Sequence, residues 1–152
     1  MAQKKQPILI LSWIARLVVA GIFLQTLFFK FTASEESVYI FTTLGVEPWG
    51  RIASGIVELA AAVLLLMPKT VWFGALLALG AMSGAILSHV TRLGIVVQDD
   101  GGLLFSLAVG SFALSLLMSI LHLPHWVLAK LASGATHPVG LSGSESFDAS
   151  RQ

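Results

Sequence analysis

The chain has 152 residues, of which 56% are hydrophobic and 11% are charged, and its formal net charge is +1. Ordinary soluble domains carry about 25% charged residues, so this composition indicates a membrane protein. The near-neutral charge provides no basic footprint for a nucleic acid. The sequence contains no cysteine, which excludes a disulfide relay, a thiolate metal site and a cysteine nucleophile.

Four apolar segments are long enough to cross a hydrocarbon core roughly 30 Å thick, which needs about 20 helical residues. A backbone in lipid must satisfy its own hydrogen bonds, and no segment shows the alternating pattern of a membrane β-strand, so we predict helices. The predicted fold class is all-α, an integral membrane four-helix transmembrane bundle with short loops in one domain of residues 1–132. The predicted spans are residues 8–31, 50–67, 71–93 and 103–121.

The first segment begins like a secretory signal, because Lys4 and Lys5 precede its apolar run. Arg16 interrupts that run, and apolar residues continue to Phe31, beyond the usual length of a signal's hydrophobic region. We therefore predict an uncleaved first helix. At the other end of the chain, residues 133–152 contain five serines and three glycines with little that could be buried. This tail is predicted to be disordered.

The charges between the spans predict the orientation, since cytoplasmic loops are enriched in Lys and Arg. With both termini in the cytoplasm, five cations fall on the cytoplasmic side and five acids fall in the two external loops. The charges predict this orientation, and the expected location is a bacterial plasma (inner) membrane, with the lipid bilayer as partner. The cations are Lys4, Lys5, Lys69, Lys130 and Arg151, and the acids are Glu35, Glu36, Glu47, Asp99 and Asp100.

Glu58 lies inside the second span, where an ionised group costs about 2.5–3.5 kcal/mol and usually finds a partner in the bundle interior. At 1.5 Å per residue, Glu58 lies about 12 Å below the outer surface, and Arg16 lies at a similar depth from the inner surface. In a core about 30 Å thick, their alpha carbons are then offset by about 6 Å along the membrane normal. We therefore predict an Arg16–Glu58 ion pair. The alternative is a purely structural pair that fixes the register of the helices.

Other polar side chains share helix faces with these two. Lys30 follows Arg16 by fourteen residues, which returns it to within about 40° of the same face. We predict that Glu58 and His89 move protons, and that a cationic funnel in the outer half of the bundle attracts a ligand. The predicted ligand-binding residues are Arg16, Lys30, Arg51, Ser54 and Arg92. The plainer reading is snorkelling to the interface for Lys30, Arg51 and Arg92, and a satisfied polar side chain for His89.

Small residues predict close packing between helices. Ser111, Ser115 and Ser119 recur every four residues in the last span, and Gly74, Gly80 and Gly84 lie in the third, where they also allow self-association into a homo-oligomer. No metal site is predicted, because His122 and His125 flank a proline without a nearby carboxylate.

Three short motifs follow one another along the chain. They are Arg16, Phe23 and Lys30 in the first span, Ser54-Gly55-Ile56-Val57-Glu58-Leu59 in the second, and Met82, Ala85 and His89 in the third. In order and spacing they resemble the DoxX-like family of small four-helix membrane proteins, over roughly residues 13–121. The chain departs from the family pattern at Leu27, where relatives often carry a glycine shortly before the lysine.

The resemblance implies the fold more directly than the function. Some relatives are linked with a membrane thiosulfate:quinone oxidoreductase, others with redox-stress complexes or with the assembly of partner proteins. We expect a small subunit of a membrane redox system that binds a quinone-like or small anionic ligand and works with a membrane or peripheral redox partner. No haem, flavin or iron–sulfur motif is evident, so the chain is not expected to be catalytic alone. The alternative is a non-enzymatic membrane scaffold or assembly factor. A small transporter ranks last, because broken helices and inverted repeats are not evident.

Overall fold

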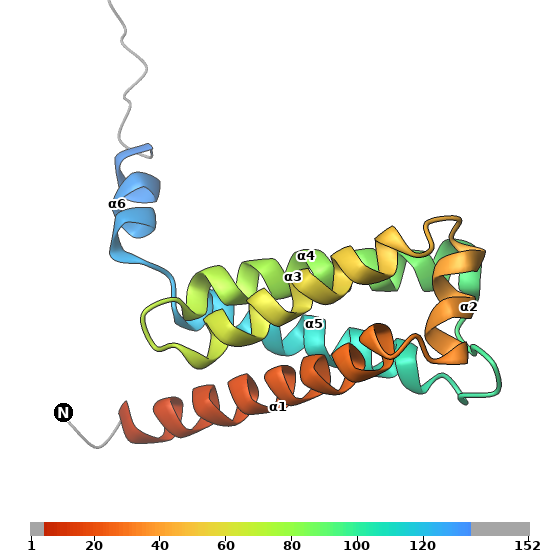
Figure 1. The fold of residues 1–152 in the computed structure, drawn as a ribbon. Coiled ribbons are helices and arrows are strands. Elements are labelled where there is room, and N and C mark those ends of the chain that lie inside the picture. Colours follow the sequence, from red (N-terminus) through yellow and green to blue (C-terminus); the bar gives the residue numbers. More distant parts are fainter. Residues whose placement is uncertain (1–4, 135–152) are drawn as a thin grey trace, which may run out of the picture.

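The computed structural model describes residues 5–134, and all regular elements in that range are helical. Four long helices alternate in direction along the chain, and each is long and apolar enough to cross a membrane (Figure 1). They are α1 (Lys5–Phe31), α3 (Trp49–Leu66), α4 (Val71–Ser88), which continues as the π-helix η1 (His89–Leu93), and α5 (Leu103–Leu121). The prediction of four membrane-spanning helices is confirmed, and these helices begin and end within three residues of the predicted spans. The tail predicted to be disordered is residues 133–152, of which 135–152 lie outside the described residues and 133–134 end the last helix.

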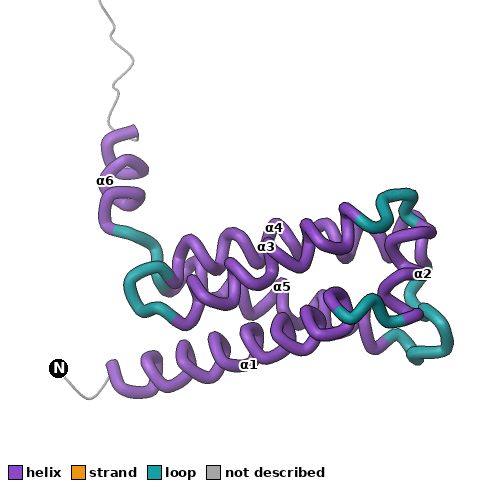
Figure 2. Tube along the Cα trace, viewed as in Figure 1, coloured by secondary structure: helices purple, strands orange, loops and turns teal. Residues whose placement is uncertain are grey.

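The four long helices form a ring in which α1 and α4 each pack against both α3 and α5 (Figure 2). Two shorter helices were not predicted. Helix α2 (Glu35–Thr43) covers one end of the bundle, and α6 (His125–Gly134) projects sideways from the other end (Figure 1). Ser34 caps α2, because its hydroxyl accepts a hydrogen bond from the backbone nitrogen of Ser37, and two glutamates in the first turn favour the positive end of the helix dipole. We refer to the two ends of the bundle as the α2 end and the α6 end.

Small side chains fill the middle of the bundle and its α6 end. Gly74 allows α4 to approach α3 closely, since a Cβ there would lie 2.7 Å from the backbone nitrogen of Leu65. Such small residues are what membrane helices use to pack, because lipid provides no hydrophobic force between them. The core contains Ala15, Val19, Ala20, Phe23, Ala61, Ala62, Leu65, Val71, Ala75, Ala78, Met82, Ala108 and Met118.

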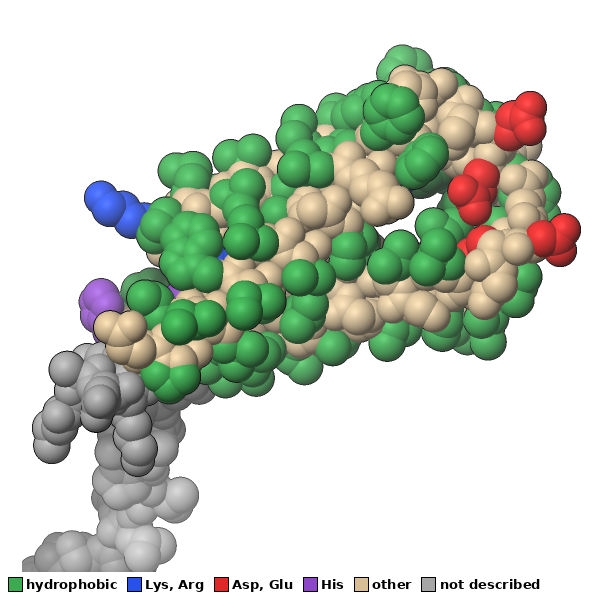
Figure 3. All heavy atoms as spheres, turned by 90° about the horizontal axis from the view of Figure 1, so that it is seen from below, with side chains coloured by type: hydrophobic (Ala, Val, Ile, Leu, Met, Phe, Trp, Pro, Cys, Tyr) green, Lys and Arg blue, Asp and Glu red, His purple; other side chains and the backbone are tan. Residues whose placement is uncertain are grey.

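Hydrophobic side chains cover the long sides of the bundle, as contact with lipid requires (Figure 3). The same view shows acidic side chains gathered at the α2 end and a basic side chain with a histidine at the opposite end. On this face the flank is apolar and the charged side chains lie at the ends.

Asp100 organises the loop between α4 and α5. Its carboxylate accepts hydrogen bonds from the backbone nitrogens of Val97 at 2.8 Å and of Gly102 and Leu104 at 2.9 Å. Burial alone would raise the pKa of Asp100, but these three N–H groups stabilise the charged form and lower the pKa below its usual value. The carboxylate thus satisfies one otherwise unpaired backbone N–H in the first turn of α5, that of Leu104, and holds the loop before it.

Replacing Asp100 with alanine is expected to reduce the unfolding free energy by about 1–2 kcal/mol, since three backbone donors lose their acceptor. A carboxyl group whose pKa is depressed in the folded state stabilises that state above its unfolded pKa of about 3.9, and the contribution disappears as the pH falls through the folded pKa. Thermal unfolding in detergent between about pH 3 and pH 6 should therefore show a difference between wild type and Asp100→Ala that shrinks towards acid pH. A difference that is the same at every pH would contradict this role.

Candidate functional site

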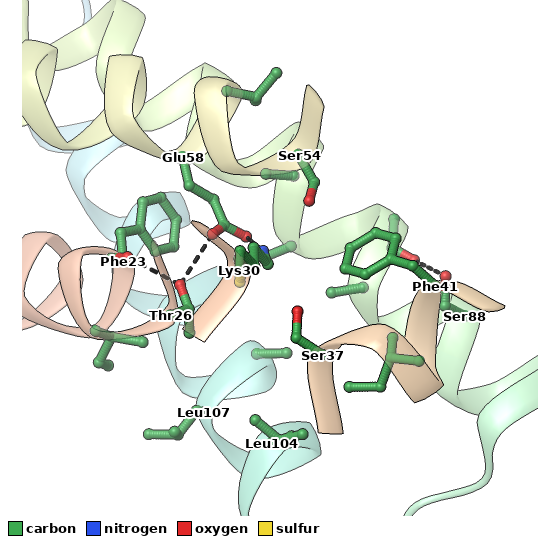
Figure 4. Close-up of a pocket in the computed structure, with 18 of the residues that line it drawn as sticks. Phe23, Thr26, Lys30, Ser37, Phe41, Ser54, Glu58, Ser88, Leu104 and Leu107 are labelled. Carbon is green, nitrogen blue, oxygen red and sulfur yellow. Dashed lines mark hydrogen bonds and ion pairs between the residues drawn. The ribbon is translucent and has the colours of Figure 1, made fainter. Parts of the chain in front are cut away.

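Glu58 is the acid at the centre of the candidate site, and its side chain points from α3 into the bundle, where it is 4% exposed. One carboxylate oxygen lies 2.5 Å from Nζ of Lys30, and the other accepts a hydrogen bond from the hydroxyl of Thr26 at 2.9 Å (Figure 4). Both partners come from the last two turns of α1. The buried charge is therefore neutralised, and α1 is tied to α3.

The predicted Arg16–Glu58 pair is wrong. Arg16 is buried, but its guanidinium donates to the carbonyl oxygens of Leu65 at 2.6 Å and Leu66 at 3.3 Å, and it lies 4.0 Å above the ring centroid of Trp13. These carbonyls belong to the C-terminal turn of α3, where backbone oxygens lack helical partners and the helix dipole is negative. The prediction considered only side-chain partners for Arg16. It also assumed that Arg16, rather than Lys30, would reach Glu58.

Arg51 lies at the α2 end of α3 and is occupied by other groups. Its Nε donates to Glu47 at 2.8 Å, its Nη2 lies 2.7 Å from the same carboxylate, and its Nη1 donates to the carbonyl oxygen of Lys30. Arg92 lies in η1 with an exposed side chain. Arg16, Arg51 and Arg92 do not line the cavity described below, so the predicted cationic funnel does not form around it.

His89 occupies the junction of α4 and the π-helix η1, and it is buried. Its Nδ1 lies 2.8 Å from the carbonyl oxygen of Gly94, which can only accept, so Nδ1 carries the proton. In a neutral imidazole, Nε2 is then free to accept a hydrogen bond. The π-helix η1 ends at Gly94, whose φ of +80° is one that glycine adopts without strain. The backbone nitrogen of Gly94 donates a hydrogen bond to the carbonyl oxygen of His89, which closes the wide turn of the π-helix.

A cavity of about 550 Å³ lies between α2 and the ends of the four long helices, and its wall is mostly apolar. This volume is within the range of ligand pockets, which is roughly 300–1,000 Å³. Figure 3 shows that the bundle is hollowed near its acidic end. Four of the predicted site residues line the cavity, namely Lys30, Ser54, Glu58 and His89.

Ser37 of α2 is a cavity residue that the sequence analysis missed. Its hydroxyl is buried and points into the cavity, and it has no hydrogen-bond partner among the described residues (Figure 4). A buried hydroxyl without a partner costs free energy, which a bound molecule with an acceptor would recover. The sequence carries no signal for it, because Ser37 looks like any other loop serine until α2 is known to cover the bundle. Among residues 5–134, no cluster of three His, Asp or Glu side chains is arranged to hold a metal ion.

Comparison with known proteins gives one match. The model of the DoxX-like family matches residues 14–117, which extend from α1 into the last turns of α5 and include every cavity residue named above. Searches of curated proteins and of solved structures found no match.

Proposed function

Because the chain belongs to the DoxX-like family and is an integral membrane protein, we propose that it is a small subunit of a membrane redox system that binds a quinone-like ligand in its cavity. The observation that carries the proposal is the wall of the cavity, which is apolar except for a few polar groups around the Lys30–Glu58 pair. A ligand with a polar ring and an apolar remainder fits such a wall.

A quinone supplies chemistry in which two electrons and two protons are exchanged. Lys30 carries three N–H donors, so in the proposed role it donates one to a quinone oxygen while it keeps its bond to Glu58, and Thr26 lies beside the same carboxylate. Glu58 and Nε2 of His89 are the groups that hold or accept protons in the proposed role. The sequence has no cysteine and no evident haem or flavin motif, so the electrons are proposed to come from a partner protein.

A small anion is the less favoured ligand. The charge of Lys30 is balanced by Glu58 and that of Arg51 by Glu47, so neither has a full charge to offer. Arg92 is exposed and lies outside the cavity wall. A neutral ligand with hydrogen-bonding oxygens needs no uncompensated cation.

The proposed orientation places the α6 end in the cytoplasm of a bacterium and the α2 end outside. It is supported by the positive-inside rule, since Lys69 lies in the α3–α4 turn and the acidic loop residues lie at the α2 end. The cavity, which α2 borders, would then extend from the middle of the membrane to its outer surface.

The proposal is tested by adding a decyl-substituted benzoquinone to the purified protein in detergent and measuring equilibrium binding. Glu58→Gln keeps the shape of the side chain but removes its charge, and it is expected to weaken binding about tenfold, because Lys30 and Thr26 lose the carboxylate that orients their donors. Glu35→Gln makes the same change on the exposed face of α2, outside the cavity, and should bind normally. Absence of binding to wild type, together with unchanged thiosulfate oxidation in cells that lack the protein, would remove the proposal.

The second candidate is a non-enzymatic scaffold or assembly factor. It is favoured by the contacts that tie α1 to α3, since Lys30 bonds Glu58 through its side chain and Arg51 through its carbonyl oxygen. A scaffold predicts that Glu58→Gln reduces the amount of folded protein and the recovery of partner proteins, without any effect of added quinone.

A further inference from the structure

The cavity reaches the flank of the bundle beside two glycines of α4. Gly80 and Gly84 line the cavity and are exposed, and a Cβ at either position would meet no atom within 4 Å. Leu76, one turn earlier, also lines the cavity and is 42% exposed. The spacing of four residues puts the three on one stripe of the helix, which we call the glycine slot.

The glycine slot lies at membrane depth. Gly80 and Gly84 are nine and thirteen residues beyond Val71, or about 13 and 20 Å along a span that continues to Leu93. An opening at that position on a membrane-spanning helix faces acyl chains rather than water. The cavity is therefore open sideways, towards lipid.

The opposite part of the cavity is polar. The buried hydroxyl of Ser37 points into the cavity and has no hydrogen-bond partner among residues 5–134, and the Lys30–Glu58 pair lies across from it (Figure 4). The site thus combines hydrogen-bonding groups at one end with an apolar exit at the other. A molecule that satisfies both ends has a polar head and a long apolar tail.

We infer that the cavity binds a tail-bearing quinone that arrives from the bilayer, with its head between Ser37 and the Lys30–Glu58 pair and its tail leaving through the glycine slot. This inference rests on the proposed function and narrows its ligand class. Lipid solvates an apolar tail as well as protein does, so the slot adds little affinity and has only to remain open. Glycine keeps it open, because a side chain as large as leucine would occupy the path of the tail.

The test uses two probes, the decyl-substituted benzoquinone and the same ring without the alkyl tail. Gly84→Leu is expected to weaken binding of the tailed probe at least about tenfold, a change of about 1.4 kcal/mol, and to leave the tail-less probe unaffected. Gly84→Ala should resemble wild type, because its methyl group meets empty space. Gly110→Leu is the matched control, since Gly110 is also an exposed helical glycine with nothing within 4 Å and lies outside the cavity wall.

The outcomes separate the slot from the head site. If Gly80→Leu and Gly84→Leu bind both probes normally, the tail does not leave through the glycine slot, and the proposed quinone site is unaffected. If these variants bind neither probe, the slot is also refuted, because the leucine would then fill the head site rather than the exit. A third outcome is that Leu107→Trp, on α5, abolishes binding of the tailed probe alone, while the glycine variants still bind it. The tail would then leave between α1 and α5 instead of through the glycine slot.

Ser37→Ala tests the head end. It should weaken the binding of both probes severalfold, because the proposed contact of the hydroxyl is with the ring and not with the tail. Unchanged binding of both probes would exclude Ser37 from the site. Failure of wild type to bind either probe would refute the proposed function itself, and the inference with it. Thermal unfolding of every variant, compared with Gly110→Leu, establishes that the folded protein is being measured.

Discussion

Replacing Lys30 with methionine is expected to reduce the unfolding free energy by about 3–5 kcal/mol, because Glu58 would remain buried without the cation that neutralises it. Thr26 would still donate one hydrogen bond to the carboxylate, but a hydroxyl cannot replace a charge. The measurement is the unfolding of the purified protein in mixed detergent micelles, followed by circular dichroism.

The double variant Lys30→Met/Glu58→Gln should be much closer to wild type than Lys30→Met alone, since it removes both charges together. Lys69→Met changes an exposed lysine in the α3–α4 turn, and its expected effect is below about 0.5 kcal/mol. If Lys30→Met is as mild as Lys69→Met, the ion pair does not stabilise the bundle.

Gly74→Ala is expected to cost about 1–3 kcal/mol, because the added methyl group would lie 2.7 Å from the backbone nitrogen of Leu65 and 2.9 Å from the carbonyl carbon of Leu64. These are backbone atoms, so the contact is relieved only if α3 and α4 move apart. The separation would disturb the turn that joins them, which should also lower the melting temperature in detergent.

Gly110→Ala provides the comparison for this change. Its methyl group meets nothing within 4 Å, and alanine is the better helix former, so the variant should be as stable as wild type or more so. Equal effects of Gly74→Ala and Gly110→Ala would mean that α3 and α4 do not depend on this close approach.

The spans were predictable because a membrane helix has a minimum apolar length, and that length is visible in one sequence. Helix α2 could not be predicted by this criterion, because its nine residues are too few to cross a bilayer. Which of its side chains are buried depends on how the helix packs over the end of the bundle, and one sequence does not show that. Ser37 was missed for that reason. Helix periodicity grouped polar residues by face, but it could not say which faces meet: Lys30, Glu58 and His89 line the cavity, whereas Arg51 and Arg92 do not.

The partner of Arg16 could not be predicted from side chains alone. The carbonyl groups at the end of α3 are present in every helix, so the sequence does not mark them as partners for a cation. The glycines of α4 show the same limit. All three were predicted to allow close packing, but only Gly74 is in tight contact with another helix, whereas Gly80 and Gly84 face open space. Spacing identifies small residues, and only tertiary structure distinguishes a contact from an opening.

The alanine-rich packing of the α6 half has a consequence for how the two leaflets meet this protein. Ala61, Ala75 and Ala78 are completely buried there, so an acyl chain beside them meets a closed wall. The hollow extends from the middle of the membrane, where Gly80 and Gly84 lie, to Ser37 at the α2 end. A lipid-soluble molecule that exchanges with the hollow meets the protein near the midplane, where the two monolayers touch, so its occupancy should follow its concentration in the whole bilayer rather than in one leaflet.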